Sequence, residues 1–347
     1  MSKKVFVGMS GGVDSSVTAA LLVREGYDVT GVYMKNWSQD LPGFTCPWQD
    51  DYQDAKRVAV QLGIDFEMYD FEKEYRTRVV DYMVAGYQAG ITPNPDIMCN
   101  QEVKFKLFLE AAIDDGADLI ATGHYARSQA GQLLTGVDAN KDQSYFLYRV
   151  TSEALAHSLM PIGDFEKPRV RELAAEFKLA TAAKKDSQGI CFVGKVGIKD
   201  FLLAELGPQP LGAIVDQNGV TIGEHDGALF YTIGQRHGLD VGGGLPYYVV
   251  GKDMAKNEVY VTTDLQDGRL WRDSLTLSAL HWINDAPADG QQLQVRSRYR
   301  APLVNCVVSV ADDTVTLALS EEVRAITPGQ SAVLYDGDRV VGGGIVI

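Results

Sequence analysis

A chain of 347 residues, 46% of them hydrophobic, is long enough to form two or three domains with their own hydrophobic cores. Its formal net charge of −14 argues against a protein that binds nucleic acid indiscriminately, so any nucleic-acid partner would need a local basic surface. No apolar stretch approaches the roughly 20 residues of a membrane span, and the N-terminus lacks the pattern of a signal peptide. We therefore expect a cytoplasmic protein.

The first half of the sequence alternates short apolar runs with amphipathic segments. Strands are predicted at 5–7, 28–34, 64–69 and 118–122, and helices from about 13 and over 51–62, 72–87, 100–114 and 168–178. This alternation predicts an α/β fold with a doubly wound parallel sheet, in which ligands bind at the carboxyl ends of the strands. Two prolines within residues 92–96 exclude helix and central strand there, and Asn100 is the expected N-cap of the helix that follows.

The second half of the sequence has a different composition. After residue 206 the chain is rich in Gly, Val, Thr and Asp, with tight turns between short alternating runs. This pattern predicts two small β domains, either barrels or sandwiches, that are divided near residues 264–271. The expected domains are an N-terminal α/β domain at 1–205, a central β domain at 206–268 and a C-terminal β-barrel domain at 269–347.

The turn after the first strand is the most specific feature of the sequence. It reads SGGVDSS over residues 10–16, between an apolar strand and a helix. Its glycines let backbone N–H groups approach a ligand closely, and the helix N-terminus behind them favours an anion. Serine hydroxyls add further donors, while the lysine of a Walker loop is absent. The turn therefore predicts a phosphate-binding site.

Two of the four cysteines lie in loops beside basic residues. Cys99 directly precedes the predicted helix that carries Lys104 and Lys106, and a helix N-terminus stabilises a thiolate. Cys191 lies in a polar, glycine-containing loop after Lys184 and Lys185. Each cysteine considered alone is also compatible with simple packing, but together they indicate thiol chemistry.

The other candidate residues carry weaker signals. Cys306 alternates with valines on a predicted strand, which favours core packing, and Cys46 receives no role. No spacing of His, Cys and Asp indicates a metal site. In a strand, Arg296, Arg298 and Arg300 would project from one face and, with Tyr299, suit a phosphate backbone. A solvated sheet face paired with acidic residues explains the three arginines equally well.

Seven motifs together resemble the bacterial tRNA-specific 2-thiouridylase family (MnmA, also called TrmU), which belongs to the PP-loop ATP pyrophosphatases. The resemblance covers essentially the whole chain, and its motifs occur in the order SGGVDSS, TPNPDIMCN, ATGHYA, KDQSYFLY, KKDSQGICF, FYTIGQRHGL and RYRAP. The pair formed by NPDxxCN and a downstream GICF is highly specific, because most PP-loop enzymes lack both.

The resemblance implies the transfer of sulfur to the wobble uridine of tRNA. ATP would adenylate the C2 oxygen, and a cysteine persulfide would then supply sulfur, which yields 2-thiouridine, AMP and pyrophosphate. Magnesium would accompany the ATP. The implied nucleotide contacts are Gly8, Met9, Ser10, Gly11, Gly12, Val13, Asp14, Ser15, Met34 and Gly123.

The resemblance also implies catalytic and tRNA-binding residues. Cys191 would carry the persulfide, Cys99 would resolve it and Asp96 would act as an acid or base. The implied contacts with the target base and the rest of the tRNA are Asn94, Pro95, Asp96, His124, Lys141, Asp142, Gln143, Tyr299, Arg300 and Gln330. The implied partners are tRNAs of the Lys, Glu and Gln type and a sulfur-donor protein, either a relay protein or a cysteine desulfurase. We expect no membrane partner and, by default, a monomer.

Two other functions remain open at this point. An AMP-forming synthetase or amidotransferase that acts on a small molecule would keep the glycine-rich turn, but would have no use for the two cysteines or the β domains. A nucleotide sensor or RNA-binding module would hold ATP without cleaving it. Substitution of each cysteine by serine tests the first alternative, and release of pyrophosphate tests the second.

Overall fold

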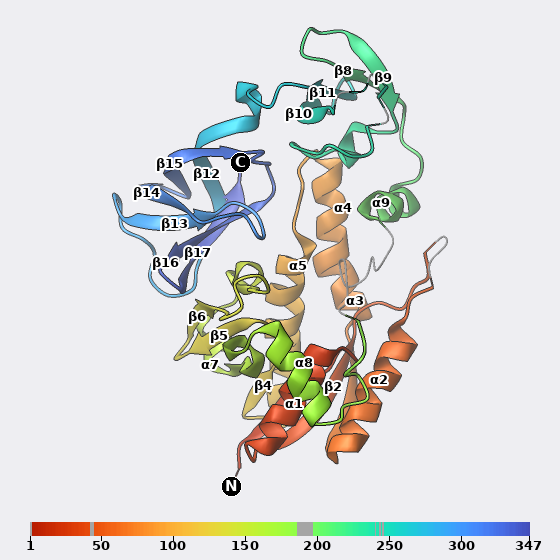
Figure 1. Ribbon diagram of the computed structural model, residues 1–347, viewed down its shortest axis with the longest axis vertical. Helices are drawn as coiled ribbons and strands as arrows, with labels where there is room; N and C mark the ends of the chain where they lie inside the picture. The colour runs from red at the N-terminus through yellow and green to blue at the C-terminus, as the bar shows by residue number, and fades with distance from the viewer. Residues whose placement is uncertain (1, 42–44, 186–196, 240, 243, 245) are drawn as a thin grey trace.

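The structure is a computed structural model that describes residues 2–41, 45–185, 197–239, 241–242, 244 and 246–347. Figure 1 shows an N-terminal α/β domain at the bottom, a small β sheet at the top and a β barrel in blue beside them. Long helical segments in the middle of the view connect the α/β domain to the small sheet. Within the part of the chain that the structure describes, no helix is both long and apolar enough to cross a membrane.

The α/β domain contains a parallel sheet, as the sequence predicts, but the sheet has a fifth strand, β7, beyond the four predicted. The order of the five strands is β3-β2-β1-β4-β7. Their bounds are Lys4–Gly8 for β1, Asp28–Lys35 for β2, Asp65–Asp70 for β3, Leu119–Ala121 for β4 and Ser158–Leu159 for β7. β1 pairs with β2 on one side and with β4 on the other. The strand order therefore reverses at β1, and a ligand is expected at the carboxyl ends of β1 and β4.

Most helices predicted for the α/β domain are present, whereas the sequence analysis does not predict α7 and α9. The α-helices are α1 (Val13–Arg24), α2 (Trp48–Leu62), α3 (Glu72–Tyr75), α4 (Asp81–Gln88), α5 (Pro95–Met98), α6 (Phe108–Asp114), α7 (Ser152–Ala156), α8 (Lys167–Glu176) and α9 (Ile198–Leu206). Wider π-helical segments, η1 (Arg76–Val80) and η2 (Cys99–Leu107), join α3 to α4 and α5 to α6 without a break. Short 3₁₀ segments are η3 (Ser144–Leu147), η4 (Pro161–Asp164), η5 (Ala228–Phe230) and η6 (Gly268–Leu270).

One predicted helix start is wrong. The helix expected from Asn100 already begins at Pro95, because proline at the first helical position loses only an N–H group that would lack a partner in any case. Its N-cap is Asn94, whose side-chain oxygen accepts hydrogen bonds from the backbone N of Asp96 at 3.1 Å and of Ile97 at 3.3 Å. Asn100 is buried and instead donates from Nδ2 to the carbonyl oxygen of Phe146 at 3.2 Å.

The second half of the chain forms two β units. The central sheet has the order β10-β11-β8-β9. Its strands are β8 (Gly212–Val215), β9 (Thr221–His225), β10 (Tyr248–Asp253) and β11 (Glu258–Thr262). The barrel strands are β12 (Trp271–Trp282), β13 (Gln292–Arg296), β14 (Val304–Ala311), β15 (Thr314–Arg324), β16 (Ser331–Asp336) and β17 (Arg339–Val346). β12 pairs with both β15 and β17, which closes a ring of six strands.

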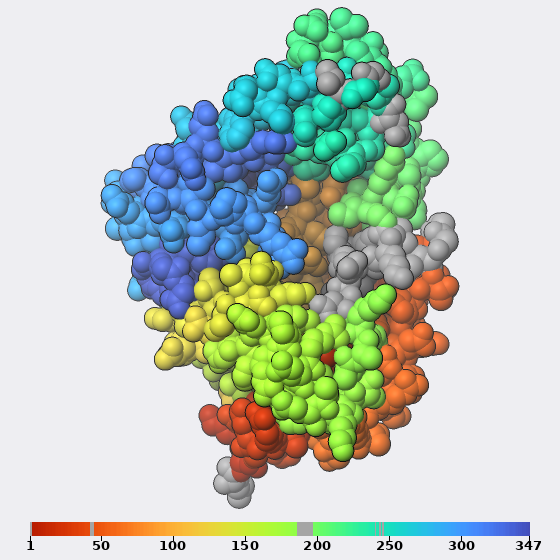
Figure 2. Space-filling view, viewed as in Figure 1, coloured from red at the N-terminus to blue at the C-terminus, as the bar shows by residue number. Residues whose placement is uncertain are grey.

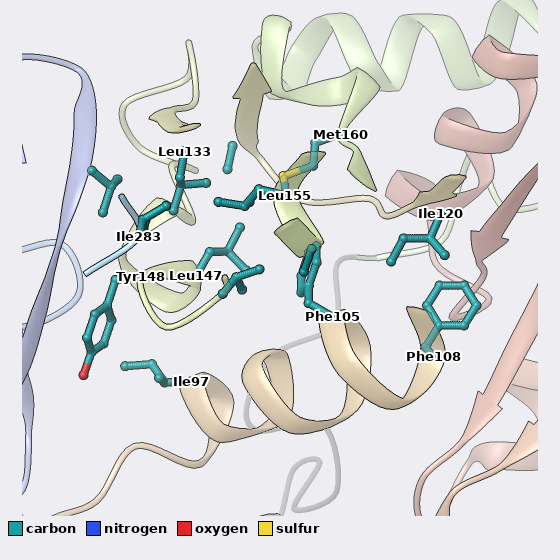
Figure 3. Close-up of a cluster of buried hydrophobic side chains, with 14 of the residues drawn as sticks. Ile97, Phe105, Phe108, Ile120, Leu133, Leu147, Tyr148, Leu155, Met160 and Ile283 are labelled. Carbon is teal, nitrogen blue, oxygen red and sulfur yellow. The ribbon is translucent and has the colours of Figure 1, made fainter. Parts of the chain in front are cut away.

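The barrel is joined to the α/β domain by a hairpin that the sequence analysis does not predict. This hairpin consists of β5 (Ala126–Gln129) and β6 (Gln132–Thr135). β6 pairs with β17 of the barrel, with Leu133 opposite Val340. The two domains also share a hydrophobic core, in which Figure 3 shows Ile97, Phe105 and Phe108 on the helical side and Ile283 on the barrel side. Burial of this shared core holds the barrel against the α/β domain.

Candidate active site

The predicted phosphate-binding loop connects β1 to α1. Gly11 has a φ of +73°, and a Cβ atom there would lie 2.3 Å from the carbonyl oxygen of Asp51. This position therefore requires glycine both for its backbone conformation and for its close contact with α2. The backbone N of Ser10 donates to Oγ of Ser15 at 3.2 Å, which closes the loop onto the first turn of α1.

The other predicted nucleotide contacts lie against this loop. A Cβ atom on Gly123, just after β4, would lie 2.8 Å from the backbone N of Ser15. A Cβ atom on Gly8 would lie 2.9 Å from Cε of Met34, near the end of β2. The structure thus brings together residues from three neighbouring strands at the carboxyl edge of the sheet. Their contact with a nucleotide stays a prediction.

Sequence reasoning missed two residues at this loop. The carboxylate of Asp14 accepts hydrogen bonds from Nζ of Lys167, at 2.7 Å to Oδ1 and 2.9 Å to Oδ2. It also accepts a hydrogen bond from the hydroxyl of Tyr125 at 2.8 Å. Lys167 is the first residue of α8 and lies 153 residues from Asp14 in sequence. A charge pair over such a separation leaves no local signal in the sequence.

Lys184 lies at the same edge of the sheet. Its Nζ contacts Oδ1 of Asp51 and Oδ2 of Asp54 on α2, both at 2.7 Å. Asp51 is also the residue whose carbonyl oxygen faces Gly11. Residues 186–196 lie outside the described residues, and with them the predicted persulfide carrier Cys191.

The prediction for the position of Cys99 is wrong in one respect. Cys99 does not precede a helix but lies inside the continuous helix that begins at Pro95, one turn beyond the N-cap. Its side chain is only 2% exposed and belongs to a hydrophobic cluster with Trp37 and Val103. Any stabilisation of a thiolate by the helix dipole is therefore weaker than the sequence suggested, because that effect decays within the first turn.

Burial shifts the pKa values of Asp96 and His124 in opposite directions. Burial raises the pKa of the Asp96 carboxyl, although the positive charge of Lys104 opposes this shift. Burial, reinforced by Lys104, lowers the pKa of His124 well below its usual value, so the ring is neutral at pH 7. Nδ1 of His124 lies 2.9 Å from Oγ1 of Thr122, and its ring packs against Phe105. His124 therefore exposes little surface for the tRNA contact predicted for it.

The predicted tRNA contacts Lys141, Asp142 and Gln143 lie in a turn that is partly buried. Asp142 is 4% exposed, and its carboxylate lies 3.0 Å from Nη1 of Arg296 on the barrel. Oε1 of Gln143 accepts a hydrogen bond from the backbone N of Tyr125 at 2.9 Å. The side chains of Asp142 and Gln143 therefore contact the rest of the protein, and contact of this turn with tRNA stays a prediction.

The expected row of three arginines is wrong. β13 ends at Arg296, and the chain then turns, with Arg300 in the left-handed region at a φ of +63°. Arg296 points inward to Asp142, whereas Arg298 and Arg300 are exposed. Alternation along a strand puts residues on one face only while the strand continues, and here the strand does not continue.

The remaining predicted tRNA residues lie in two places, Tyr299 and Arg300 beside Phe146 and Gln330 near the segment before α5. The ring of Tyr299 lies 4.4 Å from that of Phe146, and the guanidinium of Arg300 lies 5.2 Å from the ring of Tyr299. Gln330 follows Gly329, where a Cβ atom would lie 2.8 Å from the backbone N of Thr92. In Figure 2 a hollow lies between the blue barrel and the teal central domain. The brown surface at its floor lies at the position of α4 in Figure 1.

Cys306 and Cys46 lie in different surroundings. Burial raises the pKa of Cys306 to about 11, and its side chain packs inside the barrel, as predicted. Sγ of Cys46 lies 3.6 Å from the carbonyl oxygen of Trp37. Over the described residues, no group of three or more His, Cys, Asp or Glu side chains is arranged to hold a metal ion.

Three family models match the chain in succession. They are described as a tRNA methyl transferase HUP domain at residues 3–195, a tRNA methyl transferase PRC-barrel domain at residues 199–263 and an aminomethyltransferase beta-barrel domain at residues 272–346. Together they span almost the whole sequence.

Curated relatives match over nearly their full length. The tRNA-specific 2-thiouridylase MnmA of Shewanella amazonensis is 48% identical, with 99% of this chain and 94% of that protein covered. The protein of the same name from Bacillus subtilis is 46% identical, with 99% and 94% covered. That of Serratia proteamaculans is 48% identical, with 99% and 97% covered.

Solved structures are more distantly similar. A 4-thiouridine synthetase–RNA complex with bound ATP is 17% identical, with a TM-score of 0.37 over 56% of this chain and 46% of that chain. The NMN synthetase of Francisella tularensis is 18% identical, with a TM-score of 0.34 over 53% of this chain and 66% of that chain.

Proposed function

The chain belongs to the tRNA-specific 2-thiouridylase family, and from this premise we propose that it performs ATP-dependent 2-thiolation of the wobble uridine in tRNA. The observation that carries the proposal is the match of 99% of the chain to full-length thiouridylases at 46–48% identity. Three successive matched regions, at 3–195, 199–263 and 272–346, support the proposed division into three domains at 1–205, 206–268 and 269–347, although the second model begins before residue 206.

ATP is proposed to bind where β1 meets α1. The backbone N–H groups of Gly11 to Ser15 would hold the phosphates, and Met34 and Gly123 would border the nucleoside. The arrangement of these residues around one loop supports this assignment. Magnesium would neutralise part of the triphosphate charge, and the hydroxyls of Ser10 and Ser15 are oxygen donors of the kind that it binds.

The target uridine is proposed to lie near Asn94, Pro95 and Asp96. The C2 oxygen of uridine is a poor leaving group, and attack of this oxygen on the α-phosphate of ATP turns it into AMP and releases pyrophosphate. The Asp96 carboxyl, whose pKa is raised by burial, is suited to exchange a proton with the base at this step. The adjacent Pro95 is buried and would serve as a rigid wall beside a flipped-out base.

Sulfur transfer is proposed to use Cys191 and Cys99. The terminal sulfur of a persulfide on Cys191 attacks C2, and AMP leaves. The Cys99 thiolate then attacks Sγ of Cys191, which releases 2-thiouridine and leaves a Cys99–Cys191 disulfide for a reductant to open. The position of Cys99 a few residues from Asp96 in one helix supports its role near the target base.

The proposed partners follow from the same chemistry. They are tRNAs of the Lys, Glu and Gln type and a protein that delivers sulfur to Cys191. His124, the 141–143 turn, Tyr299, Arg300 and Gln330 are proposed to contact the tRNA. The closeness of Gln330 to the segment before Asn94 supports a site shared by the barrel and the α/β domain. We place the protein in the cytoplasm, as a monomer.

Thiolation itself tests the proposal. Unmodified tRNA of the Glu type is incubated with the protein, MgATP and a persulfide donor, and the digested product is analysed by nucleoside mass spectrometry. We expect wobble 2-thiouridine that requires ATP and is lost in Cys99→Ser and Cys191→Ser, but not in Cys306→Ser, because Cys306 packs inside the barrel.

Two outcomes would contradict the proposal. Turnover of ATP to AMP without a thionucleoside would favour a small-molecule synthetase. Because two of the matching family models are described as tRNA methyl transferase domains, the same digest is also read for methylated nucleosides after addition of S-adenosylmethionine. A methylated product in place of 2-thiouridine would replace the proposal.

A further inference from the structure

A carboxylate lies inside the loop proposed to bind the ATP phosphates. Asp14 is the second residue of α1, where backbone N–H groups would face the bound anion. A negative charge there repels a polyphosphate unless it is neutralised. The ammonium of Lys167 supplies the counter-charge, and the hydroxyl of Tyr125 donates a further hydrogen bond to the carboxylate.

Both of these groups are held by one turn, residues 138–143, which we call the coupling turn. The backbone of Tyr125 exchanges two hydrogen bonds with Gln143, with its N donating to Oε1 at 2.9 Å and its O accepting from the Gln143 N at 2.8 Å. The backbone N of Lys167 donates to Oδ2 of Asp138 at 2.9 Å. One end of the coupling turn therefore positions Lys167 and the other end positions Tyr125, the two partners of Asp14.

The barrel in turn holds the coupling turn. Nη1 of Arg296 lies 3.0 Å from Oδ2 of Asp142, and its guanidinium lies 5.3 Å from the ring of Tyr335. Because this pair is almost fully buried, leaving either charge without the other is costly. Arg296 is also the last residue of β13, directly before the segment that carries Tyr299 and Arg300. A ligand docked on that segment would therefore restrain Arg296.

We propose that Arg296, Asp142, Tyr125 and Lys167 are positioning residues that couple the docking of tRNA on the barrel to the binding of ATP at the Asp14 loop. The inference rests on the proposed function, since it takes tRNA and ATP as the two substrates. Bound tRNA restrains Arg296, and Arg296 restrains the coupling turn through Asp142. The coupling turn then holds Tyr125 and Lys167 against Asp14, which leaves the loop after β1 able to bind phosphates. By thermodynamic reciprocity, ATP strengthens tRNA binding by the same factor.

The test measures the affinity of the full-length protein for α,β-methylene-ATP with magnesium, by calorimetry, with and without saturating unmodified tRNA of the Glu type. In the unaltered protein we expect tRNA to tighten nucleotide binding by about fivefold or more. Tyr125→Phe removes only the hydroxyl that reaches Asp14. This variant should bind the nucleotide alone within about threefold of the unaltered protein, and tRNA should change its affinity by less than about twofold.

Arg127→Ala is the matched control. Nη2 of Arg127 lies 2.8 Å from Oδ2 of Asp338, so this pair also joins the α/β domain to the barrel. It shares no hydrogen bond with the coupling turn among the described residues. The control should keep the full effect of tRNA. A loss of coupling in Arg127→Ala equal to that in Tyr125→Phe would overturn the proposal, because general weakening of the interface would then explain both.

A second pair of variants tests the charge at Asp14. Lys167→Met should weaken nucleotide binding in the absence of tRNA by about tenfold, since the carboxylate then faces the phosphates without its counter-charge. The double variant Asp14→Asn with Lys167→Met should recover most of that loss. A double variant no better than Lys167→Met alone would show that the charge of Asp14 is not what Lys167 controls, which overturns this step.

tRNA binding is measured separately by filter binding. If the protein binds no tRNA, the proposed function fails and the coupling with it. If tRNA binds but leaves the nucleotide affinity of the unaltered protein unchanged, or if Tyr125→Phe keeps the full effect, only the coupling fails.

Discussion

The carboxyl group of Asp96 is proposed to act in catalysis, and its ionisation at pH 7 lowers the stability of the folded protein. Burial raises its pKa in the folded protein, so folding favours the protonated form. The stability that this proton provides is fully present below the ordinary Asp pKa, near 4, and is lost as the pH rises through the higher folded-state value. At pH 7 the ionised, half-buried side chain therefore lowers the free energy of unfolding. A carboxyl kept under such a cost is typical of a functional site.

Replacement of Asp96 by asparagine should separate the two effects. At pH 7 Asp96→Asn should raise the melting temperature above that of the unaltered protein, and the difference should shrink as the pH falls toward about 4. Thiolation should fall by about a hundredfold or more, because the proton-exchanging group is lost. Asp313→Asn, in the exposed turn between β14 and β15, is the control and should change neither quantity. A lower melting temperature for Asp96→Asn at pH 7 would contradict this account.

At the scale of elements, the connection between β1 and α1 shows how two adjacent glycines differ. Gly11 adopts a left-handed conformation and lies against the carbonyl oxygen of Asp51 on α2. Gly12 has a φ of −90°, which any residue can adopt, and its nearest neighbour would be Oγ of Ser10 at 3.4 Å from an added Cβ. The loop shape therefore depends on Gly11, whereas Gly12 leaves room for the approach of a ligand.

Alanine at each position should reveal this difference. Gly11→Ala puts a Cβ atom into the backbone of α2 and strains φ, so we expect a loss of stability of about 2 kcal/mol or more and nucleotide affinity reduced by about tenfold or more. Gly12→Ala should melt within about 2 °C of the unaltered protein. Thermal denaturation and nucleotide titration measure the two quantities. Equal destabilisation by both substitutions would show that the contact with Asp51 does not determine the loop.

At the scale of the whole molecule, the barrel is part of the same folded body as the α/β domain. β6 pairs with β17, the two domains share one hydrophobic cluster, and the hydroxyl of Tyr145 donates to the carbonyl oxygen of Ser331. Contacts of this kind exclude the idea of a barrel that is only tethered to the α/β domain. They place the tRNA residues predicted on the barrel beside the helix that carries Asp96 and Cys99.

Two ion pairs that join the barrel to the α/β domain among the described residues should differ in energy. The Arg296–Asp142 pair is 15% and 4% exposed, so Arg296→Met should lower the free energy of unfolding by about 3 kcal/mol. The Arg127–Asp338 pair is 29% and 62% exposed, so Arg127→Ala should cost less than about 1 kcal/mol. Denaturant unfolding followed by fluorescence measures both values. Similar costs for the two variants would mean that burial does not set the strength of the Arg296 pair.

Local features of the chain account for the predictions that proved correct. The period of apolar residues predicts the strands and helices of the α/β domain, because each element must bury one face whatever it packs against. The SGGVDSS segment predicts a strand–loop–helix unit, because glycine backbone freedom and helix capping act within a few residues. The wrong predictions concern element ends: the helix start at Asn100, the position of Cys99 that followed from it, and the row of three arginines. The helix starts earlier because Asn94 caps it and Pro95 fits its first position, and the row is broken because β13 stops at Arg296.

By itself, the sequence determined the parallel sheet, the glycine-rich loop, the β character of the second half and the family. Only the tertiary structure decided that Lys167 and Tyr125 bind the carboxylate of Asp14, that Arg296 turns inward to Asp142 and that the β5–β6 hairpin joins the barrel. The reason is physical. Periodicity and turn chemistry act between near neighbours in the chain, whereas ion pairs and strand pairing depend on which distant segments the folded core brings into contact.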